Sequence, residues 1–267
     1  MKKLVKKTAL YRLLRDVYFG LLQFVHKHRA IKQYSETMEN TGNIIAFNEP
    51  KVCFYLPYYK EDLIQLAIIT TRNYYEIDYL NYVCKVWKNG CIGEAIKGNT
   101  ILDIGSNIGN HSLFFLLECS ACMAYIFEPI KDTFEIMKKN IEINNLEKNA
   151  VLYNMGVGEC ETTAEIKGYS KKNTGGASLE INSTGNIKMC AIDNLNIHEK
   201  VGLIKIDTEG FEIGVVKGMV NLIRENHPYI MIEIQPNNFD EINNILMDIG
   251  YTYEIYDEYN HLYFYNE

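Results

Sequence analysis

The chain of 267 residues lacks an internal repeat, a low-complexity linker, a long apolar run and a regular cysteine framework. Without a repeat or a linker, nothing in the sequence requires a second full domain. A chain of this length with 47% hydrophobic residues can bury a large core. We therefore expect one large α/β domain with a helical extension.

The longest apolar run of the N-terminal segment, Val17 to Leu22, is far too short to cross a membrane. A membrane span needs roughly 18 such residues. Arg12, Arg15 and Asp16 would also interrupt the apolar core of a signal peptide. The segment is therefore predicted to be neither a transmembrane helix nor a signal peptide.

The 7 cysteines are odd in number and show no framework spacing. Cys119 and Cys122 form the single CxxC pair, and no second pair offers further zinc ligands. The pair also follows the first predicted helix of the α/β domain instead of opening it. We expect reduced thiols in a cytoplasmic protein.

Charge is divided unevenly along the chain, whose net charge is −7. Residues 1–32 carry nine Lys or Arg and one acid, so this segment has a charge of +8 and the rest −15. An acidic body argues against a nucleic-acid partner. Apolar residues recur in the basic segment at helical spacing: Leu10, Leu14, Val17, Leu21 and Phe24. This amphipathic helix is expected to pack on the domain, or to contact an anionic inner membrane face or a partner enzyme.

A glycine-spaced turn follows an apolar strand in the run ILDIGSNIG, residues 101–109. Gly105 and Gly109 let the backbone approach a ligand, and Asn107 tolerates a left-handed conformation. A second apolar run ends in Glu128, 19 residues beyond Gly109, about where a Rossmann-type site places the ribose acceptor. The pattern predicts a site for a nucleotide-like cofactor.

Strands and helices alternate over most of the remaining chain, which predicts a doubly wound, largely parallel sheet with ligand sites at the carboxyl ends of its strands. The expected strands are 123–128, 150–154, 202–207 and 229–234, and two tyrosine-rich strands end the chain. The expected helices are 131–144, one through Val220, and 239–249. Residues 160–190 are expected to form a hairpin-like insertion, with strands at 161–167 and 186–190 and a flexible tip at 170–178. Residues 98–267 would then be the cofactor-binding domain. Residues 1–97 would form the basic helix and a mixed cap, with a strand at 52–56 and mostly helical structure at 59–87.

Four carboxylates, those of Asp103, Glu128, Asp207 and Glu233, stand at or near the ends of apolar strands. Gathering them at one sheet edge is costly unless they bind a ligand. S-adenosylmethionine would suit them, because it offers a sulfonium, an ammonium and a ribose diol. NAD would use Glu128 equally well, but it leaves Asp103 and the acidic cluster at 207–212 unexplained.

Several runs resemble the FkbM-type methyltransferases, which are class I S-adenosylmethionine enzymes that generally methylate hydroxyls of sugars and natural products. The runs are ILDIGSNIGNHS, IFEP, NNL, LIKIDTEGFE and YIMIEI. The likeness extends from about Tyr75 to about Ile234, and the first hundred residues match only at Glu76. It implies a Rossmann-like, seven-stranded sheet with an antiparallel last strand and S-adenosylmethionine as the methyl donor.

The resemblance also implies roles for individual residues. Asp103, Gly105, Asn107 and Gly109 would hold the methionine part and Glu128 the ribose, with the adenine near the backbone of Gly156 and Val157. Two neighbours complete the expected cofactor contacts: Ser106, where family members commonly carry alanine, and Pro129. A simpler alternative is that Asp103 and Glu128 only cap the helices that follow them.

Asp207 and Glu209 are expected beside the transferred methyl group. One of them would take up the proton of the hydroxyl that is methylated, or hold a divalent cation. Alternatively they are only acids favoured at a helix N-terminus. His111 is the other candidate for general base. Asp207 and Glu233 are the candidate metal ligands. Lys205, inside a buried strand, is expected to pair with Glu233 on the neighbouring strand.

These observations favour an O-methyltransferase that acts in the cytoplasm on a carbohydrate, a glycan precursor or a related natural product. Aligning an acceptor oxygen with the methyl group and taking up its proton is the chemistry required of the protein. Two rival functions remain open: an NAD-dependent oxidoreductase, and a catalytically silent scaffold with the same fold. Some of the 20 tyrosines would stack on a sugar ring, and the oligomeric state is open.

Overall fold

The computed structural model describes residue 29, residues 31–168 and residues 178–266. The expected membrane or partner contact of residues 1–32 lies almost wholly outside this part of the chain, as does most of the predicted flexible tip at 170–178. Residues 31–40 are helical. Within the described residues, no helix is both long and apolar enough to span a bilayer.

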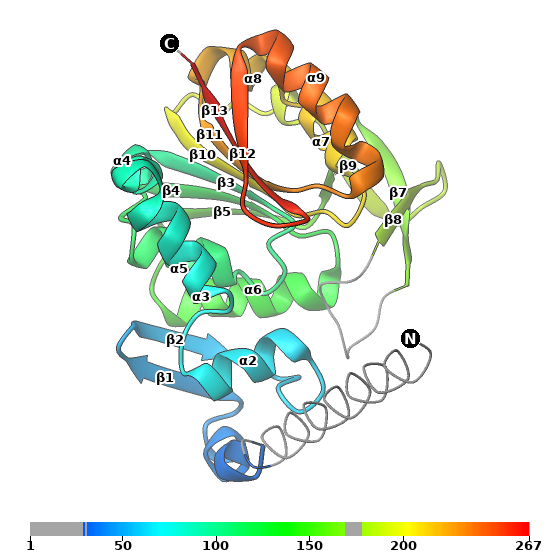
Figure 1. The fold of residues 1–267 in the computed structure, drawn as a ribbon. Coiled ribbons are helices and arrows are strands. Elements are labelled where there is room, and N and C mark those ends of the chain that lie inside the picture. Colours follow the sequence, from blue (N-terminus) through cyan, green and yellow to red (C-terminus); the bar gives the residue numbers. More distant parts are fainter. Residues whose placement is uncertain (1–28, 30, 169–177, 267) are drawn as a thin grey trace, which may run out of the picture.

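A seven-stranded sheet forms the centre of the protein, in the order β12-β13-β11-β10-β3-β4-β5 (Figure 1). The strands from β11 to β5 run parallel, and β13 is antiparallel to both β11 and β12. This confirms the predicted sheet and its antiparallel last strand. The bounds are β3 (Thr100–Ile104), β4 (Met123–Phe127), β5 (Ala150–Tyr153), β10 (Val201–Ile206), β11 (Tyr229–Glu233), β12 (Tyr251–Ile255) and β13 (Asn260–Tyr265).

Helices cover both faces of this sheet, as Figure 1 shows. They are α5 (Asn110–Leu117) and α6 (Lys131–Ile143) on one face and α7 (Glu212–Lys217), α8 (Val220–Asn226) and α9 (Phe239–Ile249) on the other. The prediction of a single helix through Val220 is wrong, because the helix is interrupted between α7 and α8. Gly218 lies in that break, so close to the Gly158 carbonyl oxygen that a Cβ would come within 2.0 Å of it.

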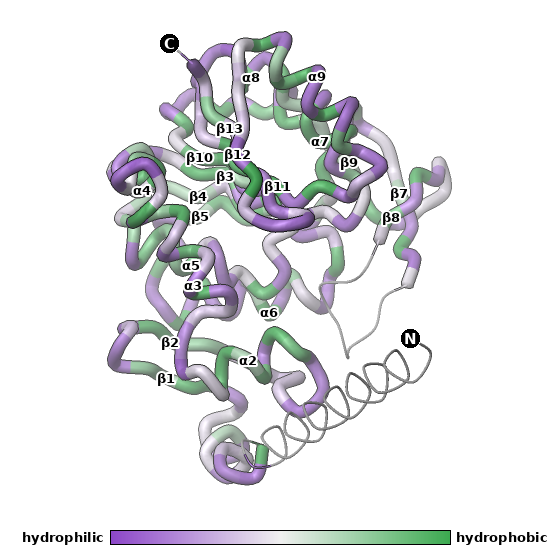
Figure 2. The backbone as a smooth tube through the Cα atoms, in the orientation of Figure 1, coloured by the Kyte–Doolittle hydropathy of each residue, from purple (hydrophilic) through white to green (hydrophobic). Residues whose placement is uncertain are grey.

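The two faces of the strands bury different residues, as expected for a sheet covered on both sides. In β3, Ile101 packs on the α5 face and Leu102 on the α7 face. In β10, Leu203 and Ile204 divide in the same way. Asp103 and Lys205 follow in this alternation and therefore point to the α5 face, side by side in register. In Figure 2 the central strands are mostly apolar, whereas the turn between β12 and β13 is hydrophilic.

Residues 44–96 form a cap that shares a hydrophobic core with the sheet domain. Its elements are β1 (Ile44–Asn48), β2 (Lys51–Tyr55), α2 (Leu63–Thr71), α3 (Ile77–Asn81), a π-helical turn (Tyr82–Val86), a 3₁₀ turn (Trp87–Gly90) and α4 (Cys91–Ile96). Asn140 of α6 and Asn144, which caps the C-terminus of that helix, hydrogen-bond the backbone of Tyr55 and Cys53 in β2 at 2.6 to 2.9 Å. The cap is thereby fixed to the face of the sheet that α5 and α6 cover.

The insertion is a small sheet of its own in the order β6-β9-β7-β8, not the predicted hairpin. Its strands are β6 (Gly156–Val157), β7 (Thr162–Lys167), β8 (Ser178–Ile181) and β9 (Ile187–Cys190). The strands β7 and β9 were predicted and pair antiparallel. The unpredicted β8 pairs with β7, and β6 pairs with β9, which brings Gly156 and Val157 beside the carboxyl end of β5.

Candidate functional site

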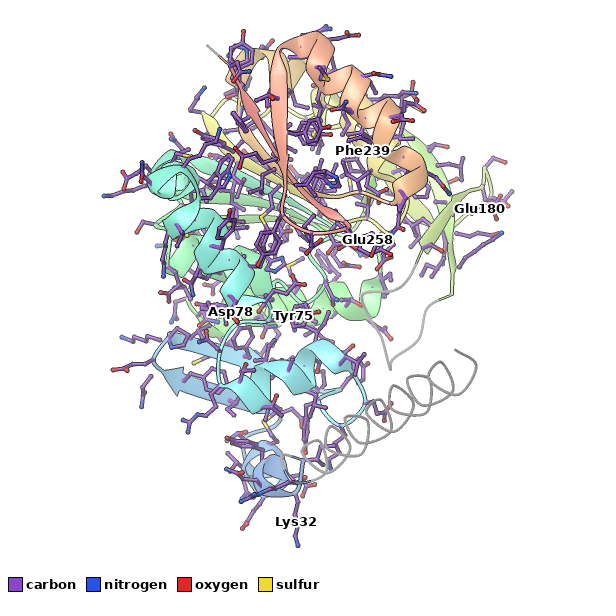
Figure 3. All side chains as sticks on the ribbon, viewed as in Figure 1. Lys32, Tyr75, Asp78, Glu180, Phe239 and Glu258 are labelled. Atoms are coloured by element: carbon purple, nitrogen blue, oxygen red, sulfur yellow. The ribbon has the colours of Figure 1, made fainter. Side chains whose placement is uncertain are left out.

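A cavity of about 590 Å³ opens at the carboxyl ends of β3, β4, β10 and β11. The turns after these strands, the start of α5, the strand β6, the cap and the β12–β13 turn all contribute to its wall. Figure 3 labels Tyr75 of the cap and Glu258 of that turn, which reach this edge of the sheet from distant parts of the chain. A site at this edge is what the sheet topology predicts.

The turn after β3 supplies one wall of the cavity, and three residues of this turn have a left-handed backbone conformation. Gly105 has φ +77° and touches the turn after β10, so that a Cβ there would lie 1.7 Å from the backbone oxygen of Asp207. Asn107 has φ +52°, which confirms the predicted left-handed conformation. Gly109, at φ +79°, precedes α5 and packs against Met137. The glycine spacing therefore serves backbone geometry and close packing.

Glu128 holds two turns together at the floor of the cavity. Its carboxylate accepts hydrogen bonds from the backbone N–H of Asn107 at 2.9 Å and from that of Ile130 at 2.8 Å. Burial raises the pKa of this carboxyl to about 8, although those two donors and Lys205 act in the opposite direction. The residue thus caps the entry to α6 and also presents a carboxyl to the cavity.

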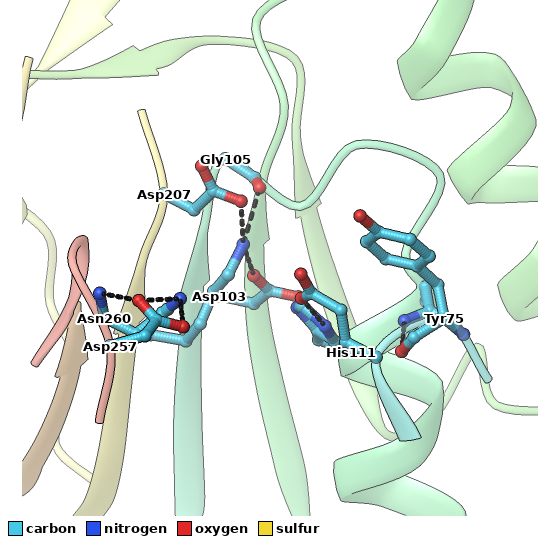
Figure 4. Close-up of polar contacts among 10 residues, drawn as sticks. Tyr75, Asp103, Gly105, His111, Asp207, Asp257 and Asn260 are labelled. Carbon is cyan, nitrogen blue, oxygen red and sulfur yellow. Dashed lines mark hydrogen bonds and ion pairs between the residues drawn. The ribbon is translucent and has the colours of Figure 1, made fainter. Parts of the chain in front are cut away.

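Lys205 does not pair with Glu233, and that prediction is wrong. Its Nζ lies 3.4 Å from Asp103 Oδ1, 3.4 Å from Asp207 Oδ2 and 2.8 Å from the carbonyl oxygen of Gly105 (Figure 4). The reason is register, because Lys205 stands opposite Asp103 on β3 and opposite Met231 on β11. Burial would lower the pKa of Lys205, but Asp207 and Asp103 outweigh it and raise the pKa above its ordinary value.

Asp103 is enclosed and does not line the cavity. Its side chain is 0% exposed, and its second oxygen accepts a hydrogen bond from Ser112 at 2.5 Å. The expected direct contact of Asp103 with a cofactor is therefore not offered by this geometry. Asp103 instead fixes Lys205, which in turn holds the carbonyl of Gly105 and the carboxylate of Asp207.

His111 and Glu76 form an acid and imidazole pair in the cavity wall. His111 Nε2 lies 3.4 Å from Glu76 Oε2. The backbone N–H and carbonyl of Tyr75 bond to the Asn110 side chain at 2.9 and 3.1 Å, so the start of α5 holds the cap segment that carries Glu76 (Figure 4). Burial alone would raise the pKa of Glu76, but the neighbouring His111 imidazole and the charge of Lys205 lower it.

Glu209 and Glu233 face the cavity with carboxylates that have no hydrogen-bond or ion-pair partner among the described residues. Burial and the charges of Asp207, Glu209 and Glu76 raise the pKa of Glu233 to about 7. Burial and Asp207 raise the pKa of Glu209 as well. No cluster of three or more metal-ligating side chains occurs in the part of the chain that the structure describes.

The structure brings most of the predicted site residues to one cavity. They are Gly105, Ser106, Asn107, His111, Glu128, Pro129, Gly156, Val157, Asp207, Glu209 and Glu233. Asp103 and Gly109 stand behind the wall. Tyr75 and the acids of the β12–β13 turn were not predicted, because their approach depends on tertiary contacts; Glu76 was marked only by its match to the family.

The residues present fit a polar, cationic cofactor. Ser106 lines the cavity, and its buried hydroxyl has no hydrogen-bond partner among the described residues. An unsatisfied buried hydroxyl costs about 1–3 kcal/mol, which a ligand would recover. Seven of the lining residues that the structure describes are Asp or Glu, against one lysine and one histidine. The cavity volume also falls in the usual range for small-molecule sites, about 300–1,000 Å³.

The strand order, the glycine turn and the carboxylate after β4 define a Rossmann-like fold of the methyltransferase class. The family model described as "Methyltransferase FkbM domain" matches residues 103–253. The chain belongs to this methyltransferase family, as its sequence motifs predicted.

The individual relatives share between 10% and 28% sequence identity with this chain. Hexuronic acid methyltransferase AglP of Haloferax volcanii is 28% identical over 145 residues, which cover 53% of this chain and 58% of that protein. A crystal structure of methyltransferase FkbM from Methylobacillus flagellatus has 20% identity and a TM-score of 0.47, and the match covers 63% of this chain and 44% of that one. M. capricolum TrmK, solved with S-adenosyl-homocysteine, has 10% identity, a TM-score of 0.36 and coverages of 68% and 67%.

Proposed function

We propose that the protein is an S-adenosylmethionine-dependent O-methyltransferase that acts on a hydroxyl of a carbohydrate or related natural product. One observation carries the proposal. A single acid-lined cavity unites the glycine turn, the Glu128 carboxyl and the His111–Glu76 pair. Membership of the FkbM family and the name of the Haloferax relative support a methyl donor and a sugar acceptor.

The charge of the cavity favours S-adenosylmethionine over NAD. S-adenosylmethionine has a sulfonium and an ammonium, whereas NAD carries an anionic pyrophosphate. A pyrophosphate is usually bound by backbone N–H groups or basic side chains. Here Lys205 is the single basic side chain other than His111 among the described lining residues, and its Nζ is already engaged by two carboxylates and a carbonyl.

We assign different roles in cofactor binding and catalysis to the residues that line the cavity. Glu128 and Asn107 would hold the ribose end, Ser106 and the backbone after β3 the methionine end, and Gly156 with Val157 the adenine. The bound cofactor would supply an activated methyl group. His111 would take the proton of the acceptor hydroxyl, with Glu76 orienting the imidazole. Asp207 is a weaker candidate for the base, because its pairing with Lys205 favours a fixed carboxylate.

A sugar acceptor is supported by the mixed lining of the open side. Tyr75 and Tyr259 line the cavity together with carboxylates that can accept hydrogen bonds from hydroxyl groups. This combination suits a ligand with an apolar ring face and a polar rim, as a pyranose has. The cytoplasmic location stays part of the proposal.

Calorimetry with S-adenosylmethionine, S-adenosylhomocysteine and NAD tests the cofactor. We expect binding of the first two and none of NAD, and the opposite result would refute the proposal and favour the oxidoreductase. Transfer of a labelled methyl group to a sugar then separates an enzyme from a scaffold. Repeating the assay with EDTA, and then with magnesium or manganese, decides whether Asp207 and Glu233 hold a cation during transfer.

A further inference from the structure

The cavity has a strong excess of acidic over basic side chains, and the excess remains when Glu128, whose buried carboxyl has a pKa of about 8, is counted as neutral. Of its described lining residues, the acids are Glu76, Glu128, Asp207, Glu209, Glu233, Asp257 and Glu258. Lys205 and His111 are the described residues that could balance them. An acceptor that enters this space must therefore tolerate or compensate negative charge.

The two basic groups, Lys205 and His111, already face other groups of the protein and are poorly placed to bind an anionic acceptor. The Lys205 side chain is 5% exposed, and its three donors face Asp103, Asp207 and the Gly105 carbonyl. His111 faces Glu76 at 3.4 Å. A carboxylate on the acceptor would thus meet no uncommitted cation among the described residues.

The acids differ in how much of their bonding capacity is used. Glu128 spends both oxygens on backbone N–H groups, and Asp257 is held by the backbone of Tyr259 and Asn260 in its own turn. Glu209 and Glu233 have no such partner among the described residues. Their neighbours are other carboxylates, which together with burial raise the pKa of Glu233 to about 7.

We propose that the reacting sugar is neutral or carries an ammonium group, and that Glu209 and Glu233 accept hydrogen bonds from it. The inference rests on the proposed function and deepens it, since it names the charge class of the acceptor. A uronic acid would add a carboxylate where carboxylates already crowd one another. The relative from Haloferax volcanii is named for a hexuronic acid, so the charges of this cavity indicate a different acceptor for this chain.

Three matched aryl glycosides of one sugar test the inference: the glucoside, the glucosaminide and the glucuronide. The same three compounds of the galacto and manno series extend the test to other ring configurations. Binding to the full chain is measured with S-adenosylhomocysteine present, and methyl transfer is measured with labelled S-adenosylmethionine. Within each series that binds, we expect the neutral and amino sugars to exceed the uronide by about tenfold or more in affinity or kcat/KM.

The variant Glu233→Gln separates charge from shape. It should reduce the ratio of glucoside to glucuronide, whatever it does to the overall rate, because one repelling charge is removed. Glu225→Gln is the matched control, since this exposed residue of α8 lies outside the cavity and its replacement changes the net charge equally. That variant should leave the ratio unchanged.

Preference for the uronide would overturn the inference, as would an unchanged ratio in Glu233→Gln. Failure of every series to bind while S-adenosylhomocysteine still binds would also overturn it, because the cavity would then not be a sugar site of this kind. The proposed cofactor would survive each of these outcomes. If S-adenosylhomocysteine itself does not bind, the proposed function has failed first.

Discussion

His111 Nε2 lies 3.4 Å from Glu76 Oε2, across the boundary between the sheet domain and the cap. His111 is the second residue of α5, and Glu76 directly precedes α3 with φ +58°. A non-glycine residue in this left-handed region costs free energy unless contacts hold it there. The clamp of Asn110 on Tyr75 supplies those contacts and aims the Glu76 carboxylate at the imidazole.

Glu76→Gln should slow methyl transfer with little effect on S-adenosylhomocysteine affinity, because it removes the charge that orients His111. His111→Gln should cost more, roughly 10²–10⁴-fold in kcat, the usual range for a general base. Stopped assays with a labelled methyl donor give kcat, and calorimetry gives the affinity. Glu39→Gln, at an exposed carboxylate paired with Lys60, is the control. Full turnover in His111→Gln would move the proton acceptor to Glu209 or Asp207.

Glu128 should make the cofactor-free protein less stable as the pH rises from about 4.5 to about 8. Its pKa is raised from 4.5 to about 8 by burial, so the folded protein keeps a proton that the unfolded chain has released. The free energy of unfolding then falls by at most about 1.4 kcal/mol per pH unit from this group. Urea denaturation across this range should show a smaller slope in Glu128→Gln than in the wild type. Equal slopes would mean that Glu128 is ionised in the folded protein at neutral pH.

Gly105→Ala should destabilise the protein much more than Gly98→Ala. Both glycines have a positive φ, +77° and +72°, but a Cβ at Gly98 meets nothing within 4 Å. At Gly105 the Cβ would lie 1.7 Å from the backbone oxygen of Asp207. The backbone strain costs about 1–2 kcal/mol at either site, and the overlap adds about 1–3 kcal/mol at Gly105 alone. Urea denaturation of the two variants measures both costs, and equal losses would contradict the close contact.

The sheet and the cavity wall formed by the β3 turn and Glu128 could be predicted from the sequence because their signals are local. The strand, the glycine turn and the spacing to Glu128 are readable along one segment, and strands buried on both faces have a strong apolar signature. The left-handed conformation of Asn107 is a local property too. These features needed no knowledge of distant contacts.

The cavity wall formed by the cap and the β12–β13 turn could not be predicted, because it is assembled by tertiary contacts. Tyr75 is placed by Asn110, and Asp257 comes from a turn between the last two strands. The partner of Lys205 depended on the register of β10 between β3 and β11, which periodicity alone does not fix. The strand β8 was missed because it has four residues and begins at Ser178, which the sequence pattern assigned to the flexible tip.

Lys205 and Asp103 should behave as a strongly coupled buried pair in a double-mutant cycle. Lys205→Met leaves the Asp103 carboxylate buried without its cation, which should cost about 3–5 kcal/mol in the free energy of unfolding. Asp103→Leu leaves the Lys205 ammonium with Asp207 as its one remaining carboxylate partner, so it should also be destabilising. The double variant should lose clearly less than the sum of the two, because an apolar pair replaces an ionic one. Urea denaturation of all four proteins gives the coupling energy.

The exposed pair Lys217 and Glu241, 2.7 Å apart, is the matched control and should couple by no more than about 1 kcal/mol. Additive losses at Lys205 and Asp103 would show that the two charges do not stabilise each other, and the support of the Gly105 carbonyl would then rest on Asp207 and the backbone alone.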